Sequence, residues 1–159
     1  MEILDLYDDN GNLLNKTVVR GEHFDNGNIM ISIVFIKNSN GEFLIQKTSK
    51  NGTLKYTSTG GHVVHGEDGV IAIVREMYEE LGLTINKDEL IEVGTCKNPD
   101  KPCLVNIFLL NKNLDINDLT LQEEEVDDVL WLSKDKILQL IDDNKFLASH
   151  GYFFKKHFN

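Results

Sequence analysis

The sequence predicts a mixed-sheet α+β domain. Segments with strand patterns outnumber helical segments, and the two kinds do not alternate as they do in a doubly wound fold. The length of 159 residues fits one ordinary domain. Hydrophobic residues make up 41% of the chain, which is close to the share typical of globular proteins. We therefore expect residues 1–159 to form a single domain.

The first half of the chain predicts two β-hairpins and then a long loop. An N-terminal hairpin is expected over residues 1–22, because Asp8-Asp9-Asn10-Gly11 supplies turn chemistry between two extended segments. Residues 29–37 are rich in β-branched side chains and predict a buried strand, with residues 42–47 returning as its partner. Residues 48–61 are dense in Ser, Thr, Asn and Gly and predict a loop, and loops of that length are often functional.

The second half predicts a helix, three strands and two further helices. The periodicity predicts a helix over 68–81, ended by Gly82 in the usual C-terminal position. Strands are expected at residues 90–96, 103–110 and 126–132. Ser133 is typical of an N-cap, so a C-terminal helix is expected from about residue 133 to about 141. Aromatic spacing over 146–158 indicates a second short helix.

Charge and composition exclude several classes of protein. The 16 basic and 26 acidic side chains give a net charge of −10, which argues against binding to nucleic acid or anionic lipid. The apolar runs are too short to cross a bilayer, and the N-terminus lacks the pattern of a secretory signal. Cys96 and Cys103 make neither a disulfide framework nor a common zinc pattern. We expect a cytoplasmic protein with reduced thiols.

The predicted helix over 68–81 carries an unusual group of acidic side chains. Glu76, Glu79 and Glu80 fall within an arc of roughly 100° on a helix. The opposite side is apolar and consists of Val70, Val74, Met77 and Leu81. Three like charges at this spacing repel one another, and no Lys follows four residues later to relieve them. A solvated acidic face is one interpretation, since charged outer faces are the norm.

A divalent cation is the other interpretation. Mg²⁺ and Mn²⁺ prefer carboxylate oxygens, so such an ion would turn this repulsion into attraction. Gly60 and Gly61 precede the helix and lack the Cβ atoms that would keep backbone carbonyls at a distance. The ion could bridge phosphates and acidify a bound water, which would let an acidic protein accept an anionic substrate.

The complete spacing decides between these interpretations. The segment 61–83 resembles the Nudix box, G-x5-E-x7-R-E-U-x-E-E-x-G-U with U apolar, at every defined position. The matching residues are Gly61, Glu67, Arg75, Glu76, Met77, Glu79, Glu80, Gly82 and Leu83. The resemblance implies an α/β/α sandwich around a mixed β-sheet. It also implies hydrolysis, with Mg²⁺ or Mn²⁺, of a nucleoside diphosphate linked to another group or of a related small-molecule diphosphate.

The resemblance also implies roles for individual residues. Glu79 and Glu80 would be metal ligands together with the carbonyl of Gly60, and Glu76 would be a further ligand or the general base. Arg75 would hold the helix against the preceding loop through Glu67 and align Glu76. The remaining box positions with a structural role are Gly61 and Gly82.

An acidic residue beyond the box often joins the metal site or serves as the base in relatives. The candidates here are Glu123, Glu124 and Glu125, which precede the strand that holds Trp131. Glu125 or Glu124 is favoured for this catalytic role. The alternative is an ordinary solvated loop, because runs of charge are usually solvated.

A finer resemblance points to the Nudix subgroup related to isopentenyl-diphosphate isomerase. It is carried by Asp8-x-x-Gly11, by the run from Asn40 to Lys47, and by Gly60-Gly61-His62-Val63. The isomerases carry a catalytic cysteine where this chain has Gly60, so the resemblance favours diphosphate hydrolysis over isomerisation. A Nudix-fold module that senses a nucleotide without turnover is a third hypothesis, although such modules usually lose the glutamates that this chain retains.

The substrate-binding candidates lie outside the helix. Relatives commonly have an arginine after the second strand, whereas Thr48 stands here, and Arg20 and Lys47 are the candidates to replace it. His62 could touch phosphate or metal, or simply bond to the backbone. Tyr56, Phe24 and Phe43 could stack on a base or pack in the core. The expected partner is a small-molecule diphosphate, and the expected state is a monomer or homodimer.

Overall fold

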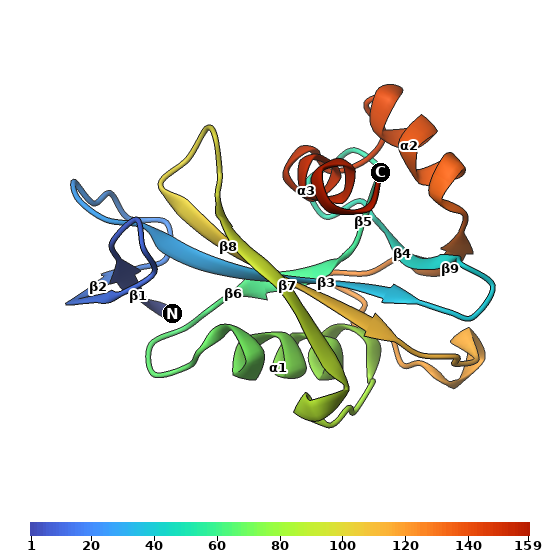
Figure 1. Cartoon of the computed structure of the whole chain (residues 1–159), viewed down its shortest axis with the longest axis horizontal. Coiled ribbons are helices and arrows are strands. Elements are labelled where there is room, and N and C mark those ends of the chain that lie inside the picture. Colours follow the sequence, from blue (N-terminus) through green and yellow to red (C-terminus); the bar gives the residue numbers. More distant parts are fainter.

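The computed structural model describes all of residues 1–159, and Figure 1 shows a central mixed sheet with helices on both faces. The sheet runs in the order β5-β4-β3-β8-β7, with β6 pairing to β3 and β9 pairing to β4. The strands are β3 (Ile29–Lys37), β4 (Phe43–Thr48), β5 (Lys55–Thr57), β6 (Thr59–His62), β7 (Leu90–Lys97), β8 (Cys103–Asn111) and β9 (Asp128–Leu132). Strands β3 and β8 are parallel, and the other pairs are antiparallel. The predicted α+β fold class is confirmed.

Two layers of core form because side chains alternate along the buried strand β3. Ile33 and Phe35 point toward the layer of α2 (Lys134–Asp142) and α3 (Ala148–Phe158). Val34 and Ile36 point to the other face, where α1 (Gly69–Leu81) packs. The sequence of strand β3 is therefore almost continuously apolar, as expected for a strand that is covered on both faces.

The N-terminal hairpin stands apart from the main sheet. Strands β1 (Ile3–Tyr7) and β2 (Leu13–Val19) form their own two-stranded antiparallel sheet. Two short bridges join β1 to the rest of the molecule, one from Leu4 to Val64 and one from Tyr7 to Asn28. The hairpin lies beside the loop that leads into α1, at the left of Figure 1.

The expectation of a continuous loop over residues 48–61 is wrong. Strand β5 pairs with β4, and β6 pairs with β3 in the register Ile33 to Gly60 and Ser32 to Gly61. These strands were not predicted because their Ser, Thr and Gly residues do not give the apolar alternation that indicates a strand. Backbone pairing requires no particular side chain, so such residues can still form a strand. Consequently Gly60 and Gly61 lie on a rigid strand.

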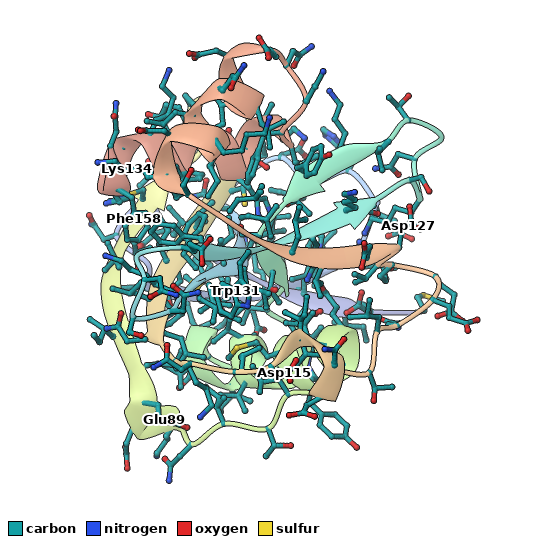
Figure 2. The ribbon with its side chains drawn as sticks, turned by 90° about the vertical axis from the view of Figure 1, so that its right-hand side faces the viewer. Glu89, Asp115, Asp127, Trp131, Lys134 and Phe158 are labelled. Carbon is teal, nitrogen blue, oxygen red and sulfur yellow. The ribbon has the colours of Figure 1, made fainter.

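The prediction that residues 42–47 return as the hairpin partner of strand β3 is only partly correct. Their pairing is confined to Lys37 and Phe43 beside the turn, after which β4 pairs with β9 from Phe43–Leu132 to Lys47–Asp128. Strand β9 begins at Asp128 and not at residue 126, because the amides of Glu125 and Val126 turn back onto the Gln122 carbonyl. Figure 2 shows β9 with Asp127 just before it and Trp131 along it.

The helices have the predicted positions. Helix α1 begins after Asp68, whose carboxylate caps the Ile71 amide, and ends at Gly82, which has a φ of 65°. Ser133 caps α2 through the Lys136 amide at 3.2 Å. Phe153 and Phe154 bury α3 against the sheet. Two short 3₁₀ helices, Lys87–Glu89 and Ile116–Asp118, lie in the connections, and none of the helices has the length and apolar character needed to span a membrane.

Candidate active site

The acidic side chains of α1 gather beside strand β6 and line one cavity. This central cavity has a volume of about 400 Å³ and includes Glu76, Glu79, Glu80, Gly60, Gly61 and Arg75 in its lining. Glu80 is only 7% exposed, and the Glu76 side chain is 13% exposed. Glu80 is therefore buried against the sheet and Glu76 is partly buried, whereas Glu79 is exposed; the first two do not form a solvated acidic face.

Gly61 sets how closely α1 approaches the sheet. A Cβ atom at Gly61 would overlap the Glu76 carboxylate, and one at Gly60 would come within 2.7 Å of the Ser32 carbonyl. Both positions thus require glycine for a close approach, although neither has a positive φ. The chain packs the Glu76 carboxylate directly against the β6 backbone.

Gly61→Ala is expected to lower turnover at least tenfold, because the added methyl group displaces the Glu76 carboxylate and small misplacements of reacting groups are costly. Gly94→Ala is the matched control, since its new methyl group meets no atom within 4 Å. Steady-state kinetics on both variants test this. Equal activity in the Gly61 and Gly94 variants would show that the Glu76 position does not matter.

Arg75 joins the α1 glutamates to the loop before the helix. Its Nε and Nη2 atoms donate to the two Glu67 oxygens at 2.7 and 2.9 Å, and Nη2 also donates to the His62 carbonyl at 3.0 Å. Its Nη1 atom donates to Glu76 at 2.9 Å and to Glu79 at 3.3 Å. Arg75 therefore makes the contact with Glu67 that the family resemblance implies.

The Glu67 carboxylate depends on this guanidinium. Burial opposes its ionisation, but hydrogen bonds from Arg75 and from the Val64 amide outweigh burial and hold the Glu67 pKa below its ordinary value. A lowered carboxyl pKa stabilises the fold above the unfolded pKa, and this stabilisation is lost as the pH falls through the folded pKa. We expect the free energy of unfolding of Glu67→Gln to fall less than that of the wild type when the pH is lowered below about 4.5. Urea unfolding measured across the acid range tests this, and unchanged acid sensitivity would contradict it.

Among the acidic residues of the cavity, Glu80 has the pKa that differs most from its ordinary value. Burial raises its pKa to about 9, and a hydrogen bond to Glu76 acts in the same direction. Burial also raises the pKa of Glu76, although Arg75 opposes this. Gln46 donates from Nε2 to Glu80 Oε1 at 3.0 Å and to the Thr59 hydroxyl at 2.8 Å. Glu80 therefore carries a proton at neutral pH in this arrangement.

The donor set fits a hard divalent cation. In the present arrangement no three of the acidic or histidine side chains converge on one point, and Arg75 binds two of the glutamates. A cation would relieve the cost of burying the Glu76 and Glu80 carboxyl groups in their charged form, and the available ligands are oxygens of the kind that Mg²⁺ and Mn²⁺ prefer. The residues that could hold it are Glu76, Glu79 and Glu80 with the carbonyl of Gly60.

The acidic loop contributes one residue to the cavity. Glu125 lines it and forms an ion pair with Lys50, whereas Glu123 and Glu124 are exposed and do not line it. Glu125 also lies close enough to Glu80 to raise its pKa. The structure thus brings together Glu125 and the α1 glutamates, and it leaves Glu124 outside.

The four predicted substrate-binding residues separate into two pairs. Arg20 and His62 line the central cavity, and burial lowers the His62 pKa to about 4, so its ring is neutral. Lys47 and Tyr56 line neither this cavity nor the two beside it, and the Lys47 ammonium lies 5.8 Å from the centre of the Tyr56 ring. These two side chains contact each other away from the acidic cluster.

The remaining aromatic and histidine side chains that the sequence singled out do not line the central cavity. Phe43 belongs to the core, where it packs edge-on against Phe154, and Phe24 lines a neighbouring apolar cavity. His65 bonds to Asp5 at 2.7 Å, which joins the loop before α1 to the N-terminal hairpin.

Sequence reasoning missed Gln46, Lys50 and His150. Gln46 could have been noticed as a buried polar residue in the apolar strand Phe-Leu-Ile-Gln. His150 comes from α3, about 90 residues from its hydrogen-bond partner Ser58, and its Nδ1 atom lies 2.5 Å from the Ser58 hydroxyl. Burial lowers the His150 pKa to about 4. No local signal could have placed His150 or Lys50 at this cavity.

Known proteins resemble this chain along its whole length. The family model described as the NUDIX domain matches residues 29–153. An uncharacterized Nudix hydrolase of Listeria innocua is 34% identical, over 97% of this chain and 91% of its own length. The crystal structure of DR0079 from Deinococcus radiodurans has a TM-score of 0.82 at 17% identity, covering 99% of this chain and 100% of that one.

A further solved structure is a bifunctional NMN adenylyltransferase/ADP ribose pyrophosphatase from Francisella tularensis, complexed with AMP and a manganese ion. It has a TM-score of 0.67 at 19% identity and covers 85% of this chain and 42% of that one. The matches to the family model and to the Listeria protein extend far beyond the box itself. This chain belongs to the Nudix hydrolase family, whose members are pyrophosphatase-type enzymes that act on small diphosphate substrates and generally use divalent cations.

Proposed function

We propose that this protein is a Mg²⁺- or Mn²⁺-dependent hydrolase that breaks a phosphoanhydride bond of a small organic diphosphate, nucleoside diphosphate compounds included. The observation that carries the proposal is the cavity whose lining includes Glu76, Glu79, Glu80 and Glu125 beside the glycines of β6. Glu80 is buried and Glu76 is partly buried, and burial raises the pKa of both carboxyl groups, so the site is suited to take up a cation. The Francisella structure, whose ADP ribose pyrophosphatase activity belongs to a protein that shares this fold over 42% of its chain, supports the same interpretation.

The chain's own residues have distinct tasks in this proposal. Glu76, Glu79, Glu80 and the Gly60 carbonyl would hold the cation, which when bound neutralises phosphate charge and acidifies a water. Arg75 fixes Glu76 and Glu79 through direct hydrogen bonds. Glu125 or Glu76 accepts a proton from the attacking water. The water oxygen bonds to one phosphorus, and the anhydride oxygen leaves with the other.

Isomerisation of a prenyl diphosphate is the second candidate, on the strength of the finer resemblance in sequence. That chemistry needs an acid at the position of Gly60. Neither Cys96 nor Cys103 lines the central cavity, and burial raises the Cys103 pKa to about 11. A nucleotide-sensing module without turnover is the third candidate, and the complete set of box glutamates argues against it. Hydrolysis agrees best with these residues.

The setting that we propose is the cytoplasm, with the protein as a monomer or homodimer and with no nucleic-acid or membrane partner. Two free cysteines and a net charge of −10 support this.

The direct test is a panel of organic diphosphates with Mg²⁺ or Mn²⁺, compared with the same panel in excess chelator. We expect hydrolysis of at least one compound with metal and none with chelator. Glu79→Gln should lower that activity by about 10²-fold, because the variant loses a carboxylate ligand. Equal rates in the variant and the wild type would remove Glu79 from the metal site. Isomerised prenyl diphosphate without any phosphate product would favour the second candidate.

A further inference from the structure

Two cavities of different character adjoin the central cavity, and His150 lines all three. The polar recess has a volume of about 90 Å³ and shares Lys50, Gly60, Glu80, Glu125 and His150 with the central cavity. The apolar chamber has a volume of about 460 Å³ and shares Arg20, Ile31, His62, Ser149 and His150 with it. A linear substrate whose anhydride lies at the α1 glutamates would therefore extend into both.

The apolar chamber can hold an organic group. Its floor consists of residues that alternate along β3 together with Val105 of β8, the partner of Ile31 in the register. Phe24 forms part of its wall. Its volume falls within the range of roughly 300–1,000 Å³ that is typical of small-molecule sites, and such sites are mainly apolar. Arg20 and Lys101 lie in the same lining, where they suit the negative charge of a phosphate ester.

The polar recess cannot hold a comparable group. Its volume is well below the lower end of that same range, and its only apolar lining residue is Leu147. Apart from the carboxyl groups of Glu80 and Glu125, the other walls present mainly hydroxyl, amide and ammonium groups, notably those of Thr48, Thr57, Asn51 and Lys55. These groups can donate hydrogen bonds to phosphate oxygens, and they offer little to an apolar ring or chain.

His150 lines both cavities and is held by a hydrogen bond. Its Nδ1 atom bonds to Ser58 at 2.5 Å, and its Cε1 atom lies 3.2 Å from where a Cβ of Gly60 would stand. It belongs to the first turn of α3, whose N-terminus has no side-chain cap. A helix N-terminus favours negative charge, so the phosphates, and not the organic group, suit the junction between the cavities.

From these two cavities we infer that the substrate has an organic group at one end only, a monoester of diphosphoric acid, with its organic group in the apolar chamber and its terminal phosphate in the polar recess. The inference rests on the proposed hydrolase function and narrows its substrate class. Water adds to one phosphorus, the anhydride P–O bond breaks, and a proton is released. The products are the organic monophosphate and inorganic phosphate. Diphosphates esterified at both ends would need a second large cavity.

The experiment compares matched substrates with the full-length protein and either metal. ADP, UDP and dimethylallyl diphosphate carry one organic group, whereas diadenosine diphosphate and ADP-ribose carry two. Chromatography of the organic monophosphates measures hydrolysis in both classes. We expect the best single-ended compound to exceed both double-ended compounds in kcat/KM by at least about 100-fold.

The outcomes separate this inference from the proposed function. Hydrolysis of a double-ended compound at a similar or higher kcat/KM would overturn the single-ended assignment and leave a diphosphate hydrolase. Hydrolysis of neither class would overturn both.

A variant tests the apolar chamber separately. Phe24→Ala should raise KM for the best single-ended compound roughly tenfold, with kcat changed less than twofold, because the wall contact binds the ground state and the transition state equally. Tyr152→Ala is the matched control, since Tyr152 is an exposed aromatic residue that lines neither the chamber nor the central cavity. Equal KM values in the two variants would show that the organic group lies elsewhere.

Discussion

Glu80→Gln is expected to lower kcat for diphosphate hydrolysis by at least about 10²-fold, because the site would lose one of the proposed ligands of the cation that generates the nucleophile. Glutamine has nearly the same size, and the Glu80 carboxyl carries a proton in the metal-free protein because its pKa is about 9. The substitution therefore replaces one neutral group with another, and the folded state should persist. Steady-state kinetics together with thermal unfolding of the metal-free protein measure both effects.

Glu124→Gln is the matched control for this change. Glu124 is an exposed glutamate of the acidic loop and does not line the central cavity, so its removal should leave kcat within about twofold. If Glu80→Gln retains full kcat while Mg²⁺ is present, Glu80 is not part of the catalytic apparatus.

Arg75→Ala is expected to reduce the free energy of unfolding by about 3 kcal/mol, because it leaves a buried carboxylate without its partner. The Glu67 side chain is 14% exposed and receives two hydrogen bonds from Arg75. The His62 carbonyl and the Glu76 carboxylate lose a donor as well. Arg75→Lys should recover little of this loss, since an ammonium cannot bridge both Glu67 oxygens in a planar fork. Urea unfolding of the metal-free protein measures the change.

Lys155→Ala is the control for the Arg75 substitution. Its ion pair with Asp142 is exposed and spans 3.3 Å, so its loss should cost less than about 1 kcal/mol. A loss of similar size in both variants would contradict the view that Arg75 holds the loop before α1.

The α1 glutamates were predictable because helical geometry is local. Spacings of three and four residues bring Glu76, Glu79 and Glu80 to one side of any helix, whatever surrounds it. The burial of Glu80 and the partial burial of Glu76 were not predictable, since they depend on how closely α1 approaches strand β6. That strand is Thr-Gly-Gly-His, which has no apolar alternation to reveal it. Tertiary pairing with β3 alone makes it a strand.

The residues around the glutamates come from distant parts of the chain. Glu125 was favoured from its position before a strand, and the turn at Gln122 directs it into the cavity. Lys50 and His150 meet it only because the 48–55 segment and α3 fold onto the same edge of the sheet. Lys47 and Tyr56 were proposed by analogy with relatives, and the pairing of β4 with β5 places them together, away from the cavity. Sequence spacing carries no information about such long-range contacts.

In the proposed site, the acidic side chains of α1 hold a divalent cation. Anomalous diffraction from crystals soaked in manganese tests whether a cation binds there. We predict a manganese peak beside the carboxylates of Glu80 and Glu79 and the Gly60 carbonyl. A map without any peak at α1, in which Glu80 still bonds to Glu76 and Arg75 still binds Glu79, would contradict it.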